Sequence, residues 1–142
     1  MRVLALDYGA ARCGCALSDP TGTLATPLEV IERPATKAGV RALRELVAAR
    51  EVDRIVVGLP LSLSGRDSDQ TREARAFADK LRSALGAGVP VDLYDERFTT
   101  AIAQRSGATD TAEDSRAAAV LLEDWLARHG HEHLGRGEGA PA

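Results

Sequence analysis

The sequence predicts an α/β fold, with a mixed five-stranded sheet that carries helices on its faces. Short apolar runs ending at turn residues indicate buried strands, and stretches with apolar residues every three or four positions indicate amphipathic helices. Three strand-like runs come first, and helices then alternate with two further strands. Strands one to three form an antiparallel meander. Because strand–helix–strand crossovers are right-handed, strands four and five lie beside strand one and parallel to it.

The predicted strands cover residues 3–8, 12–18, 23–31, 54–59 and 89–94. Pro27 lies in the third run and predicts an edge position or a bend, because proline cannot donate to a sheet. The predicted helices cover residues 37–50, 69–85 and 114–128, with a short helix after Thr99 or Thr100. Thr36 and Ser68 are the expected N-caps of the first two helices.

The chain has 142 residues, a net charge of −3 and 44% hydrophobic residues. This composition suits one domain, assigned to residues 1–129, with a flexible C-terminal tail of residues 130–142. The charge argues against a broad basic coat for nucleic acid, but not against an enzyme that holds a phosphodiester with a few arginines. No apolar run could span a membrane and no signal peptide is recognisable, so we expect a cytoplasmic protein with no membrane partner.

Cys13 and Cys15 lie two residues apart in the second predicted strand, and they therefore point to the same face of the sheet. Positions two apart on one strand are poorly placed to form a disulfide. We interpret the pair as small buried side chains, in preference to a redox or intersubunit role.

Three acidic residues stand where the predicted topology can bring them to one corner of the domain. Asp7 ends the first strand, Glu96 lies at the end of the fifth, and Asp114 opens the last helix. Converging carboxylates repel one another unless a divalent cation lies among them. Oxygen ligands favour Mg²⁺ or Mn²⁺, and two such ions would activate a water and stabilise the leaving oxygen of a phosphodiester.

Each acid also has a purely structural interpretation. An isolated Asp114 is better explained as a helix N-cap, and Glu96 could pair with an arginine at the surface. Asp7 is the hardest to explain in this way, because a carboxylate at the end of a buried strand needs a compensating partner.

Two polar segments could contact a phosphate group. The loop before the second helix contains Ser62 and Arg66 close to a helix N-terminus, although an ordinary loop is an equally good interpretation. The block DERFTT, residues 95–100, combines two acids, a base and two hydroxyls at a strand end. That density favours a site over a turn, with Arg97 holding a carboxylate or a scissile phosphate.

The chain resembles the YqgF/RuvX family over residues 1–128. Four blocks carry the resemblance, in the family's order and at about its spacing: LALDYGAARCGCALSDP, IVVGLPLSLSG, DERFTT and DSRAAAVLLEDWL. The resemblance implies an RNase H-like fold and divalent-metal-dependent hydrolysis of a nucleic-acid phosphodiester. It implies a role in maturing the 5′ end of 16S rRNA, with Holliday junction resolution attributed to some members.

The resemblance also assigns residues by position. It implies that three acids are both the catalytic residues and the metal ligands: Asp7, Glu96 and Asp114. It implies nucleic-acid contacts near the scissile strand from Arg12, Arg97 and Thr99. The implied cofactor is Mg²⁺ or Mn²⁺. The implied partners are pre-rRNA or branched DNA and a ribosomal precursor particle, for a monomer or a homodimer.

The sequence departs from the family pattern at three places. Ala11 stands where a basic residue usually precedes the motif arginine, and Ser62 stands where an asparagine often follows GLPL. Residues 107–113 are acidic and short where the family is usually basic. The lost positive charge weakens an expected contact with the nucleic-acid backbone, and it bears on affinity and substrate choice more than on the fold.

Four functions follow from these observations, in decreasing order of support. The first is a metal-dependent nuclease that acts on pre-rRNA, and the second is the same chemistry on branched DNA, which needs a dimer for paired cuts. The third is a non-catalytic nucleic-acid or ribosome-assembly binding module, suggested by the acidic residues 107–113. The fourth is an actin-like ATPase or sugar kinase, which normally closes two domain halves on a nucleotide.

Overall fold

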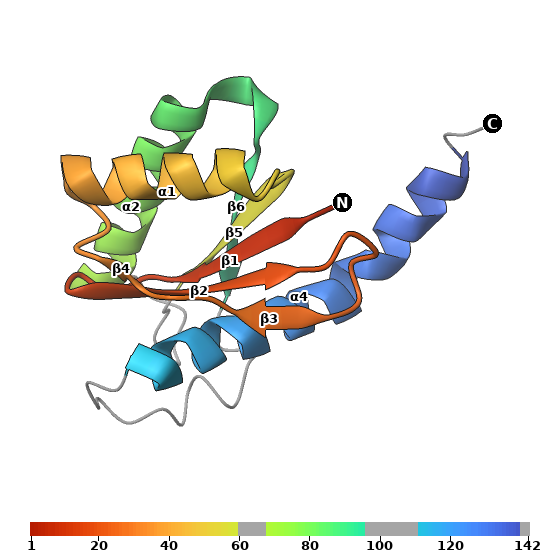
Figure 1. The fold of residues 1–142 in the computed structure, drawn as a ribbon, viewed down its shortest axis with the longest axis horizontal. Helices are drawn as coiled ribbons and strands as arrows, with labels where there is room; N and C mark the ends of the chain where they lie inside the picture. The colour runs from red at the N-terminus through yellow and green to blue at the C-terminus, as the bar shows by residue number, and fades with distance from the viewer. Residues whose placement is uncertain (60–67, 96–110, 140–142) are drawn as a thin grey trace.

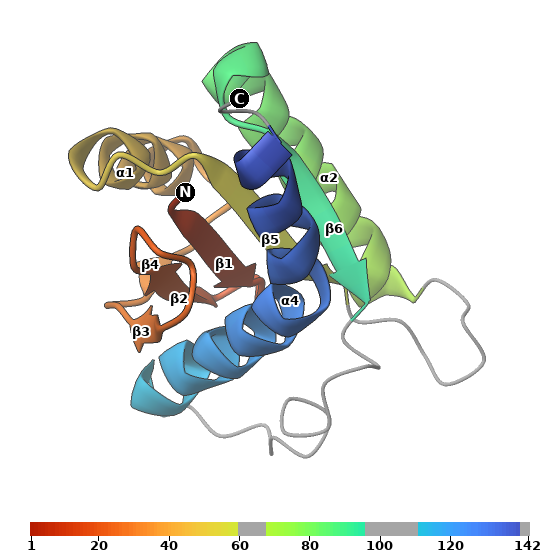
Figure 2. The ribbon, with the colours of Figure 1, turned by 90° about the vertical axis from the view of Figure 1, so that its right-hand side faces the viewer.

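The computed structural model describes residues 1–59, 68–95 and 111–139, which form a sheet between two helical layers (Figure 1, Figure 2). The strands are β1 (Val3–Asp7), β2 (Arg12–Ser18), β3 (Ala25–Pro27), β4 (Ile31–Glu32), β5 (Arg54–Leu59) and β6 (Val91–Asp95). The helices are α1 (Lys37–Ala49), α2 (Asp69–Leu85), the short 3-10 helix η1 (Gly86–Gly88) and α4 (Thr111–Gly139). Of the described helices, none is both long and apolar enough to cross a membrane.

The sheet has the strand order β3-β2-β1-β5-β6, and β4 also pairs with β2. Strand β1 is antiparallel to β2 and parallel to β5, which is parallel to β6. The predicted fold class, the antiparallel meander and the parallel strands are therefore confirmed. All of β1 is buried, because it is central in the sheet and helices cover both faces.

The predicted third strand is wrong in extent, since residues 23–31 contain the short strand β3 and only the first residue of a second one, β4. The sheet consequently has six strands and not the five predicted. Strand β3 ends at Pro27, which has no N–H to donate. The next residue, Leu28, donates its N–H to the Cys15 carbonyl at 2.9 Å and accepts the Ser115 hydroxyl of α4 at 2.5 Å. The Ser115 hydroxyl therefore occupies the Leu28 carbonyl, which in a continuous strand would accept a hydrogen bond from the neighbouring strand.

The first two long helices begin where the sequence predicted. The Thr36 hydroxyl accepts a hydrogen bond from the N–H of Gly39 at 3.1 Å. The Ser68 hydroxyl accepts one from the N–H of Thr71, also at 3.1 Å. Both predicted N-caps are thus confirmed.

The last helix is longer than predicted at both ends. It begins at Thr111, so Asp114 lies about one turn inside it and is not its N-cap. It continues to Gly139, over residues that the sequence assigns to a flexible tail. The division into a domain of residues 1–129 and a tail of 130–142 stays a prediction. The short helix predicted after Thr99 or Thr100 lies outside the described residues.

Side chains of the sheet alternate between two cores. In β1, Leu4 and Leu6 face the layer of α1 and α2, whereas Val3 and Ala5 face α4. Figure 1 shows α1 and α2 above the sheet and α4 below it. On the α4 side the buried residues include the four predicted from the helical spacing: Ala118, Leu121, Leu122 and Trp125.

Leu121 is fully buried on the inner face of α4. We expect Leu121→Ala to lower the free energy of unfolding by about 2–5 kcal/mol, because it removes buried methyl groups and leaves a cavity. Urea denaturation measures this loss. The matched control is Leu126→Ala, which truncates a partly buried leucine of the same helix and should cost less. Equal losses in the two variants would contradict the observed packing of α4.

Candidate functional site

The carboxyl ends of the three parallel strands meet at one edge of the sheet, and acidic residues stand there. Asp7 ends β1, while Leu59 and Asp95 pair at the ends of β5 and β6. Asp7 is only 3% exposed. Such an edge is where open α/β sheets bind ligands, and a buried carboxylate needs hydrogen bonds or a cation. This edge is therefore the candidate site.

Asp114 reaches the same edge from the first turns of α4. The Nε of Arg12, the first residue of β2, donates to its Oδ2 at 2.9 Å. Both side chains are largely shielded from solvent, with 21% of Arg12 and 14% of Asp114 exposed. Asp7, Arg12 and Asp114 line one cavity of about 200 Å³, together with residues 8–11. The structure thus brings together three of the predicted site residues from three separate elements.

The close approach of α4 to the sheet depends on a glycine in β2. Gly14 pairs with Asp7 in the β1–β2 ladder. A Cβ atom at Gly14 would lie 2.1 Å from the backbone oxygen of Asp114 and 3.2 Å from the backbone nitrogen of Ser115. The shorter distance is far below van der Waals contact with a backbone atom, so the first turns of α4 lie against the strand only because no side chain intervenes. The separation of the two aspartates therefore depends on Gly14.

Gly14 is not among the site residues predicted from the sequence, although the sequence contains a signal for it. A glycine inside an apolar strand pattern indicates a bulge or the close approach of another backbone. The run Cys13-Gly14-Cys15 shows that pattern. It does not identify α4 as the element that approaches, because that helix lies about a hundred residues further along the chain.

The groups beside the aspartates stay protonated at neutral pH. Cys13 and Cys15 are fully buried in the core under α1 and α2, which confirms that they are buried side chains. The hydrogen bond with Cys15, burial and the nearby Asp114 raise the pKa of the Cys13 thiol. Burial, Glu73 and Cys13 raise the pKa of the Tyr8 phenol, which lines the cavity. Neither Cys13 nor Tyr8 is therefore an anionic nucleophile in this protein at neutral pH.

The donor set of the cavity suits a hard divalent cation. Its described lining contains the Asp7 and Asp114 carboxylates and no histidine or cysteine. Carboxylate oxygens are the ligands that Mg²⁺ and Mn²⁺ prefer. Within the described ranges no three His, Cys, Asp or Glu side chains are grouped to hold a metal. The two aspartates are thus a partial ligand set, and the predicted third ligand, Glu96, lies outside the described residues.

Four further predicted site residues also lie outside the described part of the chain, and their roles stay predictions: Ser62, Arg66, Arg97 and Thr99. The chain leaves β5 at Leu59 and β6 at Asp95, and both strand ends lie at the edge that carries Asp7. The order of the strands is therefore compatible with these assignments.

This sheet order, with helices on both faces, is that of the RNase H-like fold. Solved structures agree on the fold. The Thermus thermophilus RuvC structure matches 92% of this chain and 97% of its own, with a TM-score of 0.52 at 19% identity. The fowlpox virus Holliday junction resolvase matches 90% of this chain and 99% of its own, with a TM-score of 0.51 at 12% identity.

The chain belongs to the RuvX family, whose model is described as a Holliday junction resolvase and matches residues 1–128. Two relatives bear the name "Putative pre-16S rRNA nuclease". The protein from Maridesulfovibrio salexigens is 40% identical, over 90% of this chain and 99% of its own. That from Koribacter versatilis is 39% identical, over 91% of this chain and 88% of its own. The predicted family, fold and nuclease class are confirmed.

Gly14→Ala tests the contact on which the cavity depends. We expect it to lower the free energy of unfolding by about 1–3 kcal/mol, because the new methyl group forces α4 away from β2. The control is Gly88→Ala, since a Cβ atom there meets no atom within 4 Å. Chemical denaturation compares the two, and a Gly14→Ala variant as stable as Gly88→Ala would show that the helix can move without cost.

Proposed function

We propose that this protein is a divalent-metal-dependent hydrolase that cleaves nucleic-acid phosphodiesters, with a precursor of 16S rRNA as its substrate. The convergence of Asp7 and Asp114 on one cavity is the observation that carries the proposal. The names of relatives at 39% and 40% identity support the choice of substrate. We place the reaction in the cytoplasm, at the 5′ end of the precursor and on a ribosomal precursor particle.

Asp7 and Asp114 would hold Mg²⁺ or Mn²⁺, with Glu96 as the third ligand. When bound, such ions activate a water and stabilise the leaving oxygen of the phosphodiester. Asp7 is a rigid ligand, because β1 is hydrogen-bonded to a neighbouring strand on each side. Arg12 orients the Asp114 carboxylate through its Nε and presents its other N–H groups to a phosphate oxygen of the substrate.

Branched DNA is the second candidate substrate. The family model is described as a Holliday junction resolvase. The T. thermophilus RuvC structure in complex with a Holliday junction shares this fold, with a TM-score of 0.53 at 20% identity. A resolvase needs two active sites for its paired cuts, so it acts as a dimer. A strictly monomeric protein in analytical ultracentrifugation would count against this candidate.

Asp7→Asn tests the proposed chemistry. We expect cleavage to slow by more than about 100-fold. Loss of a residue that only supports a metal ligand already costs up to about 100-fold, and loss of a ligand itself should cost more. The melting temperature should stay near that of the wild type, because asparagine keeps the shape and removes a charge near Asp114. The control is Asp53→Asn, at the opposite edge of the sheet, where the side chain accepts a hydrogen bond from the N–H of Arg2.

The assay offers a 16S rRNA precursor and a four-way DNA junction side by side. Defined cleavage near the 5′ end of the precursor, lost in Asp7→Asn, is the expected result. Symmetric cuts in the junction alone would favour the resolvase. Full activity of Asp7→Asn would overturn the role of Asp7. No cleavage of either substrate by folded wild-type protein would favour the binding module.

Removal of the metal gives a second, independent readout. We expect EDTA to abolish cleavage and excess Mg²⁺ to restore it. Saturating Mg²⁺ should also raise the melting temperature of the wild type. A ligand that binds only the folded state, present at 100 times its Kd, raises the free energy of unfolding by about 2.7 kcal/mol. Asp7→Asn should lose this thermal shift, while Asp53→Asn should keep it. The same shift in all three proteins would place the ion elsewhere.

A further inference from the structure

Helices α1 and α2 lie side by side over one face of the sheet (Figure 1, Figure 2), and residues of both line an open groove of about 850 Å³. Four exposed cationic side chains line this basic groove: Lys37, Arg41 and Arg44 from α1, and Lys80 from α2. Among its described lining residues the sole carboxylate is Asp79, which already pairs with Arg82 at 2.8 Å. The groove is therefore strongly positive, although the whole chain has a net charge of −3.

The cations of the basic groove have no carboxylate partner within the described part of the chain, unlike Arg12 and four other arginines. Elsewhere salt bridges join Arg54 to Asp92, Arg72 to Asp69, Arg82 to Asp79 and Arg128 to Asp124. The spacing of Lys37, Arg41 and Arg44 places them on one face of α1, where like charges repel. A row of unpaired positive charges is stabilised when a polyanion binds across it.

The Lys80 ammonium is positioned at the groove by a hydrogen bond to an uncharged group. Its amine donates to the backbone carbonyl of Ala35 at 2.9 Å, next to the start of α1. This bond leaves the positive charge uncompensated and two ammonium protons for another acceptor. Cations therefore face the groove from both of its helices.

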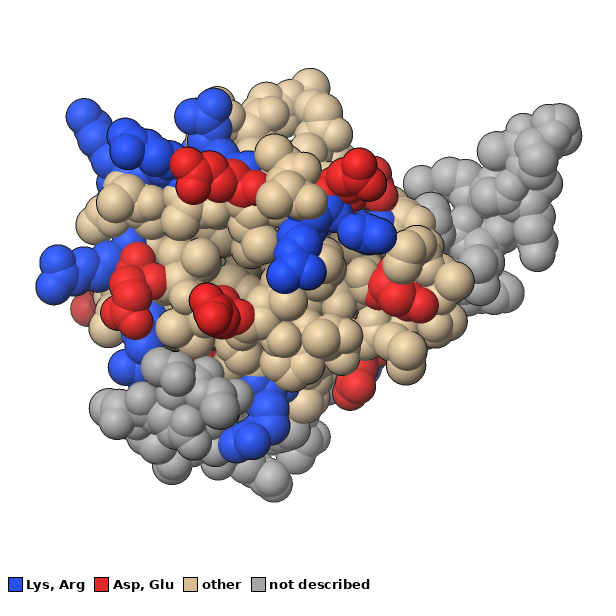
Figure 3. Space-filling view, viewed as in Figure 1, with Lys and Arg blue, Asp and Glu red and all other residues tan. Residues whose placement is uncertain are grey.

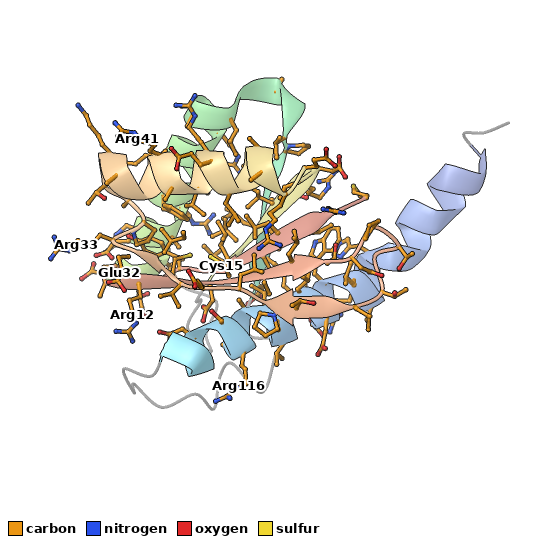
Figure 4. The ribbon with its side chains drawn as sticks, in the orientation of Figure 1. Arg12, Cys15, Glu32, Arg33, Arg41 and Arg116 are labelled. Carbon is orange, nitrogen blue, oxygen red and sulfur yellow. The ribbon has the colours of Figure 1, made fainter. Side chains whose placement is uncertain are left out.

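Arg33 connects the basic groove to the candidate site. Its backbone N–H donates to the carbonyl of Ala11, in the turn that lines the cavity, at 2.9 Å. Its own carbonyl accepts the Thr36 hydroxyl at 2.7 Å. Figure 4 shows Arg12, Arg33 and Arg41 at the same end of the molecule, on the left of the view. Cations thus lie both at the cavity and at the start of the groove, with the acidic Glu32 labelled between Arg33 and Arg12.

The start of α1 is fixed against this connection. A Cβ atom at Gly39 would lie 2.3 Å from the Arg33 carbonyl oxygen, so the first turn of the helix packs directly on that backbone. Figure 3 shows Lys and Arg gathered in the upper left of the view, over the first turns of α1. The distance from the cavity to the basic groove is therefore set by backbone contacts and not by long side chains.

We propose that the basic groove binds the sugar–phosphate backbone of a helical arm of the nucleic acid whose scissile strand lies at the Asp7 cavity. The stretch from Lys37 to Arg44 covers roughly 10 Å of α1, enough for about three phosphates of one strand. Contacts with phosphates carry no sequence information, so the groove positions the substrate without selecting bases. The location of the scissile strand rests on the proposed function, whereas phosphate binding by the groove does not require cleavage.

The test measures binding without cleavage. Fluorescence anisotropy in EDTA follows the full-length protein on a labelled RNA duplex with a single-stranded 5′ extension, over a series of KCl concentrations. Arg41→Gln/Arg44→Gln removes two cations of the basic groove. The control, Arg50→Gln/Arg128→Gln, makes the same change in net charge at exposed positions outside the groove. Thermal melts establish that both variants are folded.

We expect the groove variant to bind about 10-fold more weakly at about 0.1 M KCl, with the slope of log Kobs against log[KCl] reduced by about 1.4–1.8. The control should change affinity by less than about twofold and keep its slope, because its charges contact no phosphate. Lys80→Gln alone should reduce the slope by about 0.7–0.9. Equal losses in the groove variant and the control, or no loss in either, would overturn the proposal.

Failure of this inference and failure of the proposed function are distinguishable. Cleavage by the wild type together with normal binding by the groove variant would overturn the groove and leave the nuclease. If the wild type cleaves nothing but the groove variant binds more weakly than the wild type, phosphate binding by the groove would be supported and the nuclease function overturned.

Discussion

The contact between the first turns of α4 and the backbone of β2 determines the geometry of the candidate site. Gly14 lies beside Asp7 in the sheet and beneath the backbone of Asp114, so one missing side chain controls the position of two carboxylates. The same contact brings Asp114 within hydrogen-bond distance of Arg12. Farther along the helix, buried apolar residues such as Leu121 and Leu122 hold α4 on the sheet and so maintain this contact.

The chemistry of the site follows from where its acids are held. Asp7 cannot move toward solvent, because β1 is buried along its length and paired on both sides. Asp114 stands on a helix that packs against that sheet, and Arg12 is the cation that compensates its charge in the structure. Two shielded carboxylates on rigid elements repel each other, and a divalent cation bound beside them would add to the compensation that Arg12 gives Asp114. This arrangement brings two acids from distant parts of the chain to one cavity.

The distribution of charge reconciles an acidic protein with a nucleic-acid substrate. A net charge of −3 argues against a broad basic surface, but it is compatible with a local one. Several arginines outside the basic groove pair with carboxylates, whereas Lys37, Arg41 and Arg44 stand in a row without such partners in the described chain.

The sequence by itself determined the order and type of the elements and the prominence of Asp7. Periodicity and capping are local, so α1, α2 and β5 begin where Thr36, Ser68 and Arg54 predict. Only the tertiary structure decided where the third strand breaks, because the Ser115 hydroxyl that binds the Leu28 carbonyl comes from 87 residues away. It also decided that Asp114 faces Arg12 instead of capping a helix, and that α4 is the backbone approaching Gly14. Contacts of this kind depend on which distant segments pack together, and no local pattern specifies them.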